Sequence, residues 1–227
     1  MIKKHIGYSK LFILLGSLLM VFSCKQIEED PGQITVSLAL SASSEESLKI
    51  SQGKFFISEL FIESQTESGK RTELNRLVEK EIDLKNGSLK ELIQFQLPPA
   101  VYNDINIMMK LGNDNGQSAI YLKGERRGLG LTQLPFVFDN SSTEWIDIEA
   151  KAVSGNQAVV KRGGKNLITL EVKPQIWFQP IGLGQWLAGE LRPFEGKETL
   201  WISPEENPEM FQIINGRIKQ SFSAKFE

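Results

Sequence analysis

The segment Gln33-Ile34-Thr35-Val36-Ser37-Leu38-Ala39-Leu40 alternates large aliphatic side chains with small or polar ones. Successive side chains of an extended strand point to opposite faces of a sheet, so this period of two predicts a strand with one buried face. The four large aliphatic residues of the segment are expected to share that face. Alternation of this kind dominates the chain from Gln33 onward.

The same pattern predicts further strands at residues 54–63, 78–84, 89–97, 102–111, 118–123, 133–138, 144–150, 158–161, 167–172 and 199–203. The apolar face shifts midway along 54–63, which predicts a bulge or burial on both faces. Residues 65–76 are polar and are expected to form a connection with a helical turn. Turn signals about every ten residues indicate a mainly β fold, a sandwich or barrel, rather than alternating β and α units.

The character of the chain changes from about residue 175. Ile176-Trp177-Phe178 reads as a short strand, whose two large aromatic side chains would point to opposite faces and both be buried. Residues 184–191 are expected to contain a helical turn. Asn207-Pro208 has the form of a helix start, and apolar residues follow it at helical spacing, namely Phe211, Ile214, Ile218 and Phe222. The fold expected is an antiparallel β-sandwich with a short C-terminal helix packed on it.

The segment Leu97-Pro98-Pro99-Ala100-Val101-Tyr102 separates two of the predicted strands. Its prolines cannot donate to a ladder, so they end the strand before them. The segment resembles the LPxGxY motif of exported Bacteroidota β-sandwich lipoproteins, with Ala100 where those proteins usually have glycine. The resemblance implies a transthyretin-like or immunoglobulin-like domain, in families mostly of unassigned function. A relation to fimbrillin-type pilus subunits stays open.

Residues 1–24 have the order of a secretory signal peptide. Three lysines among the first ten residues precede an apolar run at residues 11–22, which is shorter than the roughly 20 residues that a membrane-spanning helix needs. Ser23 then stands directly before Cys24, the only cysteine. This ending resembles the lipobox of bacterial lipoproteins, in which the cysteine takes a diacylglycerol group and becomes the new N-terminus. The resemblance implies lipidation at Cys24, and two or three acyl chains give a stable membrane anchor.

These signals divide the chain into three parts. Residues 1–23 are the expected signal peptide, residues 24–32 an acidic tether, and residues 33–227 a single β-sandwich domain with an aromatic and helical extension from about residue 175. The run Glu28-Glu29-Asp30 resembles the surface-export signal of Bacteroidota lipoproteins. It implies an outer-membrane protein on the cell surface, with the periplasmic face as the alternative.

The only histidine, His5, lies in the expected signal peptide. The mature chain therefore has no imidazole, and its one cysteine is expected to carry lipid. Such a chain cannot build a Ser-His-Asp or Cys-His nucleophile pair, nor a zinc or copper site with His or Cys ligands. No basic stripe with interleaved aromatics indicates a nucleic-acid partner. We expect no metal, no cofactor and no catalysis, although two carboxylates could in principle make a hydrolase.

Three of the four tryptophans, Trp177, Trp186 and Trp201, lie in the last quarter of the chain. Clustered tryptophans usually form core, but exposed aromatic rings also bind sugars and proteins. With Trp177 expected in the core, Trp186 and Trp201 are the candidate ligand-binding residues. Alanine at Trp186 is expected to cost little stability.

The sequence therefore favours a lipid-anchored, non-catalytic surface protein that binds a glycan or a protein. The alternative is a structural or adhesin subunit of a fimbrillin-like surface assembly, whose sheet edges pair with a strand of a neighbour. Oligomerisation of the soluble domain would separate the second function from the first. A hydrolase that uses two carboxylates is the third possibility.

Overall fold

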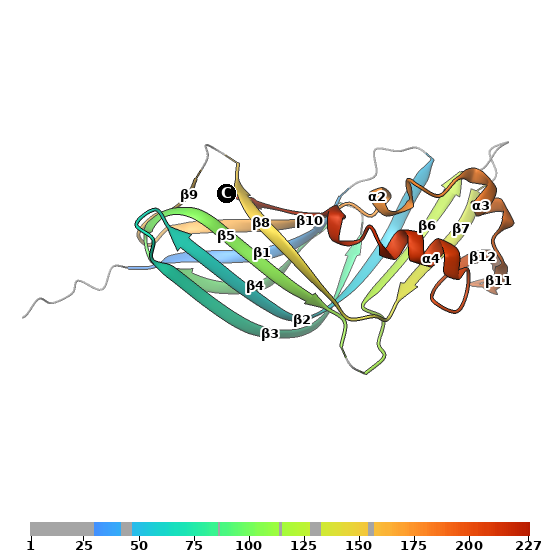
Figure 1. The fold of residues 1–227 in the computed structure, drawn as a ribbon, viewed down its shortest axis with the longest axis horizontal. Helices are drawn as coiled ribbons and strands as arrows, with labels where there is room; N and C mark the ends of the chain where they lie inside the picture. Colours follow the sequence, from blue (N-terminus) through green and yellow to red (C-terminus); the bar gives the residue numbers. More distant parts are fainter. Residues whose placement is uncertain (1–29, 42–46, 86, 114, 128–132, 154–156) are drawn as a thin grey trace, which may run out of the picture. The chain divides into compact units, whose positions relative to one another are not determined.

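The fold is seen in a computed structural model, which describes residues 30–41, 47–85, 87–113, 115–127, 133–153 and 157–227 (Figure 1). The described part of the chain is mainly β, with 63% of its residues in strands and 11% in helices. Residues 31–227 form one compact unit. Cys24 and the expected signal peptide lie outside the described residues. Within the described ranges, no helix is long and apolar enough to cross a membrane.

The strands belong to one large mixed sheet. They are β1 Gly32–Leu40, β2 Leu48–Thr66, β3 Arg71–Lys85, β4 Leu89–Leu97, β5 Ala100–Leu111, β6 Ile120–Arg127, β7 Gln133–Asn140, β8 Glu144–Ala152, β9 Ala158–Val160, β10 Lys165–Val172, β11 Leu191–Phe194, β12 Lys197–Ile202 and β13 Phe222–Phe226. The helical segments are α2 Gln175–Phe178, α3 Leu183–Ala188, α4 Pro208–Asn215 and the 3-10 turn η3 Lys219–Ser221. Each strand expected between residues 33 and 172 is present, and most are longer than expected.

Strand β2 organises the sheet, because it has different neighbours along its length. Its first half pairs with β6 and its second half with β5, while β3 pairs along its other edge. The register with both β3 and β5 shifts between Ile57 and Glu59, and Glu79 of β3 has a positive φ of 45° beside the shift. The bulge expected midway along residues 54–63 is confirmed. It marks the point where β2 passes from one part of the sheet to the other.

One part of the sheet has the strand order β3-β2-β5-β8-β13-β10-β1-β4. Strand β1 pairs in parallel with β10, and β13 in parallel with β8, so the sheet is mixed where the sequence predicted an antiparallel one. The buried face expected for β1 is confirmed, since Ile34, Val36 and Leu38 are each 0% exposed. The end strands β3 and β4 follow each other in the chain, and the Ser88 amide donates to the Lys85 carbonyl in the turn between them.

The other part of the sheet runs from β2 through β6, β7 and β12 to β11. Figure 1 shows the helices α2, α3 and α4 gathered beside β6, β7 and β12. Their contact with the sheet is aromatic: Phe138 of β7 stacks on Phe211 of α4 with ring centroids 5.7 Å apart, and Phe136 lies 5.0 Å from Phe178. The helix expected after Asn207-Pro208 is confirmed as α4.

The segment 97–102 joins β4 to β5 and is fixed by its tyrosine. Tyr102 is only 1% exposed, and its hydroxyl donates a hydrogen bond of 2.8 Å to the carbonyl oxygen of Pro98. This bond ties the start of β5 back to the end of β4. Ala100 is not among the residues with positive φ, so the position where the resembling motif has glycine does not require one here.

Residues 65–76 do not form the expected connection with a helical turn. Strand β2 continues to Thr66, Gly69 turns the chain with a φ of 84°, and β3 begins at Arg71. Polar pairs link the two strands, such as Asn75 Nδ2 with Glu59 Oε1 at 2.6 Å. Because residues 71–77 of β3 are largely exposed, that stretch carries no apolar alternation to mark the strand.

The expected strand at 176–178 is wrong, because these residues form the one-turn helix α2. The expected burial of both aromatic residues is confirmed, with Trp177 0% and Phe178 1% exposed. From adjacent positions on the turn both rings reach β7, where Trp177 lies 6.0 Å from Phe138 and Phe178 5.0 Å from Phe136. A run of three apolar residues is too short for its period to separate a strand from a helix.

The C-terminal helix α4 ends at Asn215 and is therefore shorter than the helical spacing up to Phe222 predicted. Ile218 is buried after the end of the helix, and Phe222 begins strand β13, which lies between β8 and β10. The Phe222 ring makes an edge contact with Phe55 of β2, with centroids 6.5 Å apart. Strand β13 pairs with the edges of β8 and β10, which would otherwise have no partner. A helix continued past Gly216 would leave these two edges unpaired.

Candidate functional site

Trp186 does not lie on the surface. It belongs to α3, is 1% exposed, and lies 5.3 Å from Phe136 and 5.9 Å from Phe178 between ring centroids. The expectation that Trp186 offers an exposed platform is therefore wrong. Because the ring is buried, we now predict that its loss lowers stability, in place of the small cost expected from the sequence. The physical reason is that α3 packs its one tryptophan against β7, where it completes the aromatic core.

Trp201 lies on the opposite face of the sheet from the helices. It alternates along β12 with the buried Leu200 and Ile202, and it is itself half-buried. Its ring lies 5.2 Å from Phe194 of β11 and 6.2 Å from Tyr121 of β6 between centroids. Strand order brings these side chains together, because the parallel pairing of β12 with β7 sets the β11–β12 hairpin beside β6 and β7, which are distant in the chain.

Two cations complete this group, which we call the Trp201 cluster: Tyr121, Lys123, Arg192, Phe194 and Trp201. The guanidinium carbon of Arg192 lies 3.4 Å from the centroid of the Trp201 ring, and Arg192 is ion-paired with Glu206. Lys123 Nζ lies 4.9 Å from the centroid of the Phe194 ring and 5.9 Å from that of Tyr121. The cluster therefore combines three aromatic rings with two positive charges.

The protonation of the cluster is set by its neighbours. The hydrogen bond from Lys123 to the Glu195 carboxylate raises the pKa of Lys123 above its usual value. Burial raises the pKa of Tyr121, and the nearby carboxylates Glu195 and Asp139 raise it further, against the opposing charge of Lys123. Near neutral pH the lysine is therefore charged and the tyrosine is a neutral phenol, so the cluster carries donors for acceptor groups of a ligand.

Two hollows adjoin the cluster. One has a volume of about 370 Å³ and is lined by residues that include Arg192, Trp201, Asp139 and Ser203. The other has a volume of about 160 Å³ and is lined by residues that include Lys123 and Phe194. The aromatic rings thus lie between two depressions lined partly by polar residues. A partner surface with projecting side chains would fit this shape.

Sequence reasoning named Trp201 but missed Tyr121, Lys123 and Arg192. The sequence does contain a signal for Tyr121. It alternates along β6 with the buried Ile120 and Leu122, so it lies on the outward face, where a polar residue is usual and a large aromatic ring is not. No local pattern in the sequence could show that β6 and β11 lie on either side of β7 and β12.

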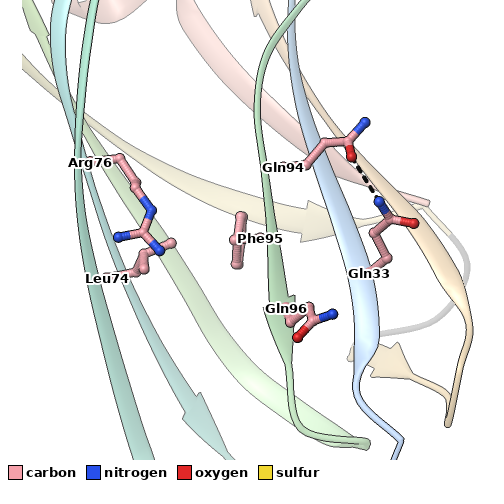
Figure 2. Close-up of a pocket in the computed structure, with 6 residues that line it drawn as sticks. All are labelled: Gln33, Leu74, Arg76, Gln94, Phe95 and Gln96. Carbon is pink, nitrogen blue, oxygen red and sulfur yellow. Dashed lines mark hydrogen bonds between the residues drawn. The ribbon is translucent and has the colours of Figure 1, made fainter.

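A separate opening lies between β3 and β4, and we call it the β3–β4 seam (Figure 2). It has a volume of about 460 Å³, and its lining residues are Gln33, Leu74, Arg76, Gln94, Phe95 and Gln96. On its rim, Gln33 Nε2 donates a hydrogen bond of 2.7 Å to Gln94 Oε1. Figure 2 shows Arg76 extending from β3 into the gap, with Phe95 projecting from β4 on the other side.

The described part of the chain has no group of three or more His, Cys, Asp or Glu residues placed to hold a metal ion. No family model, no curated protein and no solved structure matches this chain.

Proposed function

We propose that this chain is a lipid-anchored, non-catalytic protein of the cell surface that binds a protein partner through the Trp201 cluster. The observation that carries the proposal is the half-buried Trp201 with Tyr121, Phe194 and Arg192 around it, on the sheet face that the helices leave uncovered. Tryptophan, tyrosine and arginine are the residue types that dominate the binding energy of protein interfaces.

The geometry favours a protein over a glycan. A sugar ring stacks on a bare aromatic face, but Arg192 lies over the Trp201 ring at 3.4 Å and is held there by Glu206. A guanidinium stacked on an indole keeps its N–H groups available at its edge, where a carbonyl or carboxylate of a protein can accept them. A sugar would first have to displace this stacked pair.

The anchor belongs to the proposal as well. Under this proposal, residues 1–23 are removed, Cys24 is lipidated, and residues 24–32 tether the folded part to the outer membrane. The resemblance of the N-terminal segment to a lipobox supports this arrangement, and the acidic run Glu28-Glu29-Asp30 supports export to the outer face. The acyl chains are the proposed contact with the membrane.

The proposed absence of catalysis is supported by the sequence, because the one histidine, His5, falls within the segment proposed to be removed. The proposal retains a β-sandwich of the transthyretin-like or immunoglobulin-like type. It is supported by the largely antiparallel pairing and by the buried alternating faces of β1 and β5.

The test is site-specific photo-crosslinking on cells that display the full chain. A photoreactive amino acid at Lys197, which lines the smaller hollow, should give a crosslinked protein product. The product should be lost in Trp201→Ala and retained in Trp145→Ala, a matched control that removes a tryptophan 43% exposed on β8. A product that survives Trp201→Ala would contradict the proposal, and so would Trp201-dependent binding of a glycan with no protein product.

A further inference from the structure

The β3–β4 seam leaves two strand edges without partners. Within the described ranges, β3 pairs only with β2 and β4 only with β1, although the two strands are joined by a turn. Each edge therefore presents unpaired N–H and C=O groups along the cleft. Two of the large apolar side chains that are most exposed lie on these same strands, Leu77 of β3 at 75% and Leu89 of β4 at 50%. Free edges of this kind are sites for pairing with another strand.

We propose that the seam accepts one extended segment of a different protein, which pairs with an edge of β3 or β4 and carries an acidic side chain opposite Arg76. A peptide backbone is the ligand that supplies alternating N–H and C=O groups to such edges, at about 4.8 Å from its neighbour. The side chains that the segment turns inward would be apolar on either side of the acid, because Leu74 and Phe95 line the cleft there.

The inward direction of Arg76 follows from its register. Arg76 pairs with Leu60 and Leu74 with Ile62 on β2, and both β2 residues are core residues no more than 1% exposed. Cross-strand partners share one face of a sheet, so Arg76 lies on the face of β3 that continues the core. Across the seam, Phe95 pairs with the buried Ile34 of β1 and lies on the inner face as well.

Arg76 is a cation without a counter-charge in this cleft. Its Nη1 donates a hydrogen bond of 3.3 Å to the carbonyl oxygen of its neighbour Asn75, and no carboxylate of the described residues is paired with it. The other guanidinium N–H groups are left to solvent or to a ligand. An arginine on the inner face beside Leu74 and Phe95 has its charge satisfied best by a carboxylate that arrives with the inserted strand.

The structure also bears on the source of the segment. Among its described strands, a second copy of this chain could offer only an end strand such as β3, β4 or β11, and each of these is held along its other edge by its own sheet, so it cannot enter the cleft as a free extended segment. Residues 24–31, which precede β1, are proposed to be held at the membrane by Cys24. The segment is therefore assigned to a different protein. This inference does not depend on the Trp201 cluster, which lies on other strands.

The probe is a labelled synthetic peptide in which threonine alternates with valine and a central aspartate replaces one valine. Fluorescence anisotropy with the full chain should show it binding at least about tenfold more tightly than the same peptide with a central lysine, because a like charge opposite Arg76 is repelled. Arg76→Glu should reverse this preference, and Arg76→Gln should abolish it. Arg71→Glu is the matched control, because Arg71 is on the same strand but is paired with Glu63.

A peptide methylated at alternate backbone nitrogens should not bind, because it cannot complete the ladder. The inference is overturned if the aspartate and lysine peptides bind equally, if the methylated peptide binds as tightly as its parent, or if none of the peptides binds. If the purified chain alone forms oligomers that dissociate in the Arg76→Glu variant, the segment comes from a second copy, and its assignment to a different protein is wrong. Loss of crosslinking in Trp201→Ala with unchanged peptide binding would separate this site from the Trp201 cluster.

Discussion

The guanidinium carbon of Arg192 lies 3.4 Å from the centroid of the Trp201 ring, and Glu206 holds the guanidinium in place. This stacked pair makes the arginine, rather than the indole face, the group that an approaching molecule meets first. A cation over an aromatic ring at a surface is worth about 0.5–1 kcal/mol, and the ion pair adds to it. The stacked pair is therefore expected to be formed before a ligand arrives.

Trp186 and Trp201 should differ in their contribution to stability. Trp186→Ala should lower the free energy of unfolding by about 3–5 kcal/mol, because it empties a fully buried site among Phe136 and Phe178. Trp201→Ala should cost roughly half of that or less, because its ring is only half-buried. Urea unfolding of both variants gives the comparison, and equal losses would contradict the placement of Trp186 in the core.

Gly124 should not tolerate a side chain. A Cβ there would lie 2.5 Å from the Lys49 carbonyl oxygen and 2.6 Å from the Phe136 ring, so Gly124→Ala should destabilise the fold by about 1–3 kcal/mol. Gly184→Ala in α3 is the matched control, because a Cβ there meets nothing within 4 Å, and it should stabilise the fold by about 0.4–1 kcal/mol. Thermal unfolding of the two variants should shift in opposite directions.

Tyrosine ionisation should be suppressed in the folded chain. The pKa of Tyr102 is raised by burial and that of Tyr121 by burial above all, from an ordinary value of 10.0. Because the folded chain holds the two phenol protons more tightly than the unfolded chain does, protonated tyrosine stabilises the fold. This stabilisation is intact below pH 10 and is lost as the pH rises through the folded pKa values. In residues 24–227, which contain no other tyrosine, tyrosinate absorbance should rise together with unfolding. Early titration of one tyrosine in Tyr102→Phe would show that Tyr121 is open to solvent.

Cys24 should be the point of attachment to the membrane. Cys24→Ala should abolish incorporation of a labelled fatty acid and leave the chain either unprocessed or released, because no other residue can take the thioether-linked lipid. Trp201→Ala serves as the control, since its change lies in the folded part and should leave labelling intact. A Cys24→Ala chain that remains labelled and membrane-bound would rule out the proposed anchor.

The sequence predicts strands well where one face is buried, as in β1 and β5, because burial imposes a period of two on the residues. It fails at residues 71–77 of β3, which are exposed or at most half-buried, and at α2 and β13, which are too short to show a period. The site could be predicted only in part. Trp201 is visible as an aromatic residue at a polar position, but Trp186 looks equivalent in sequence, and only the packing of α3 on β7 separates them.

The position of β13 has a consequence for the order in which the chain can fold. Strand β10 lies between β1 and β13, so the first strand of the unit reaches β8 only through residues 222–226. A chain that folds from its N-terminal end would keep the facing edges of β8 and β10 open until these residues arrive. Closure through contacts so distant in sequence is slow, and the open edges are prone to wrong pairing while they wait. Correct folding of this chain therefore depends on keeping two strands available until a third has been delivered.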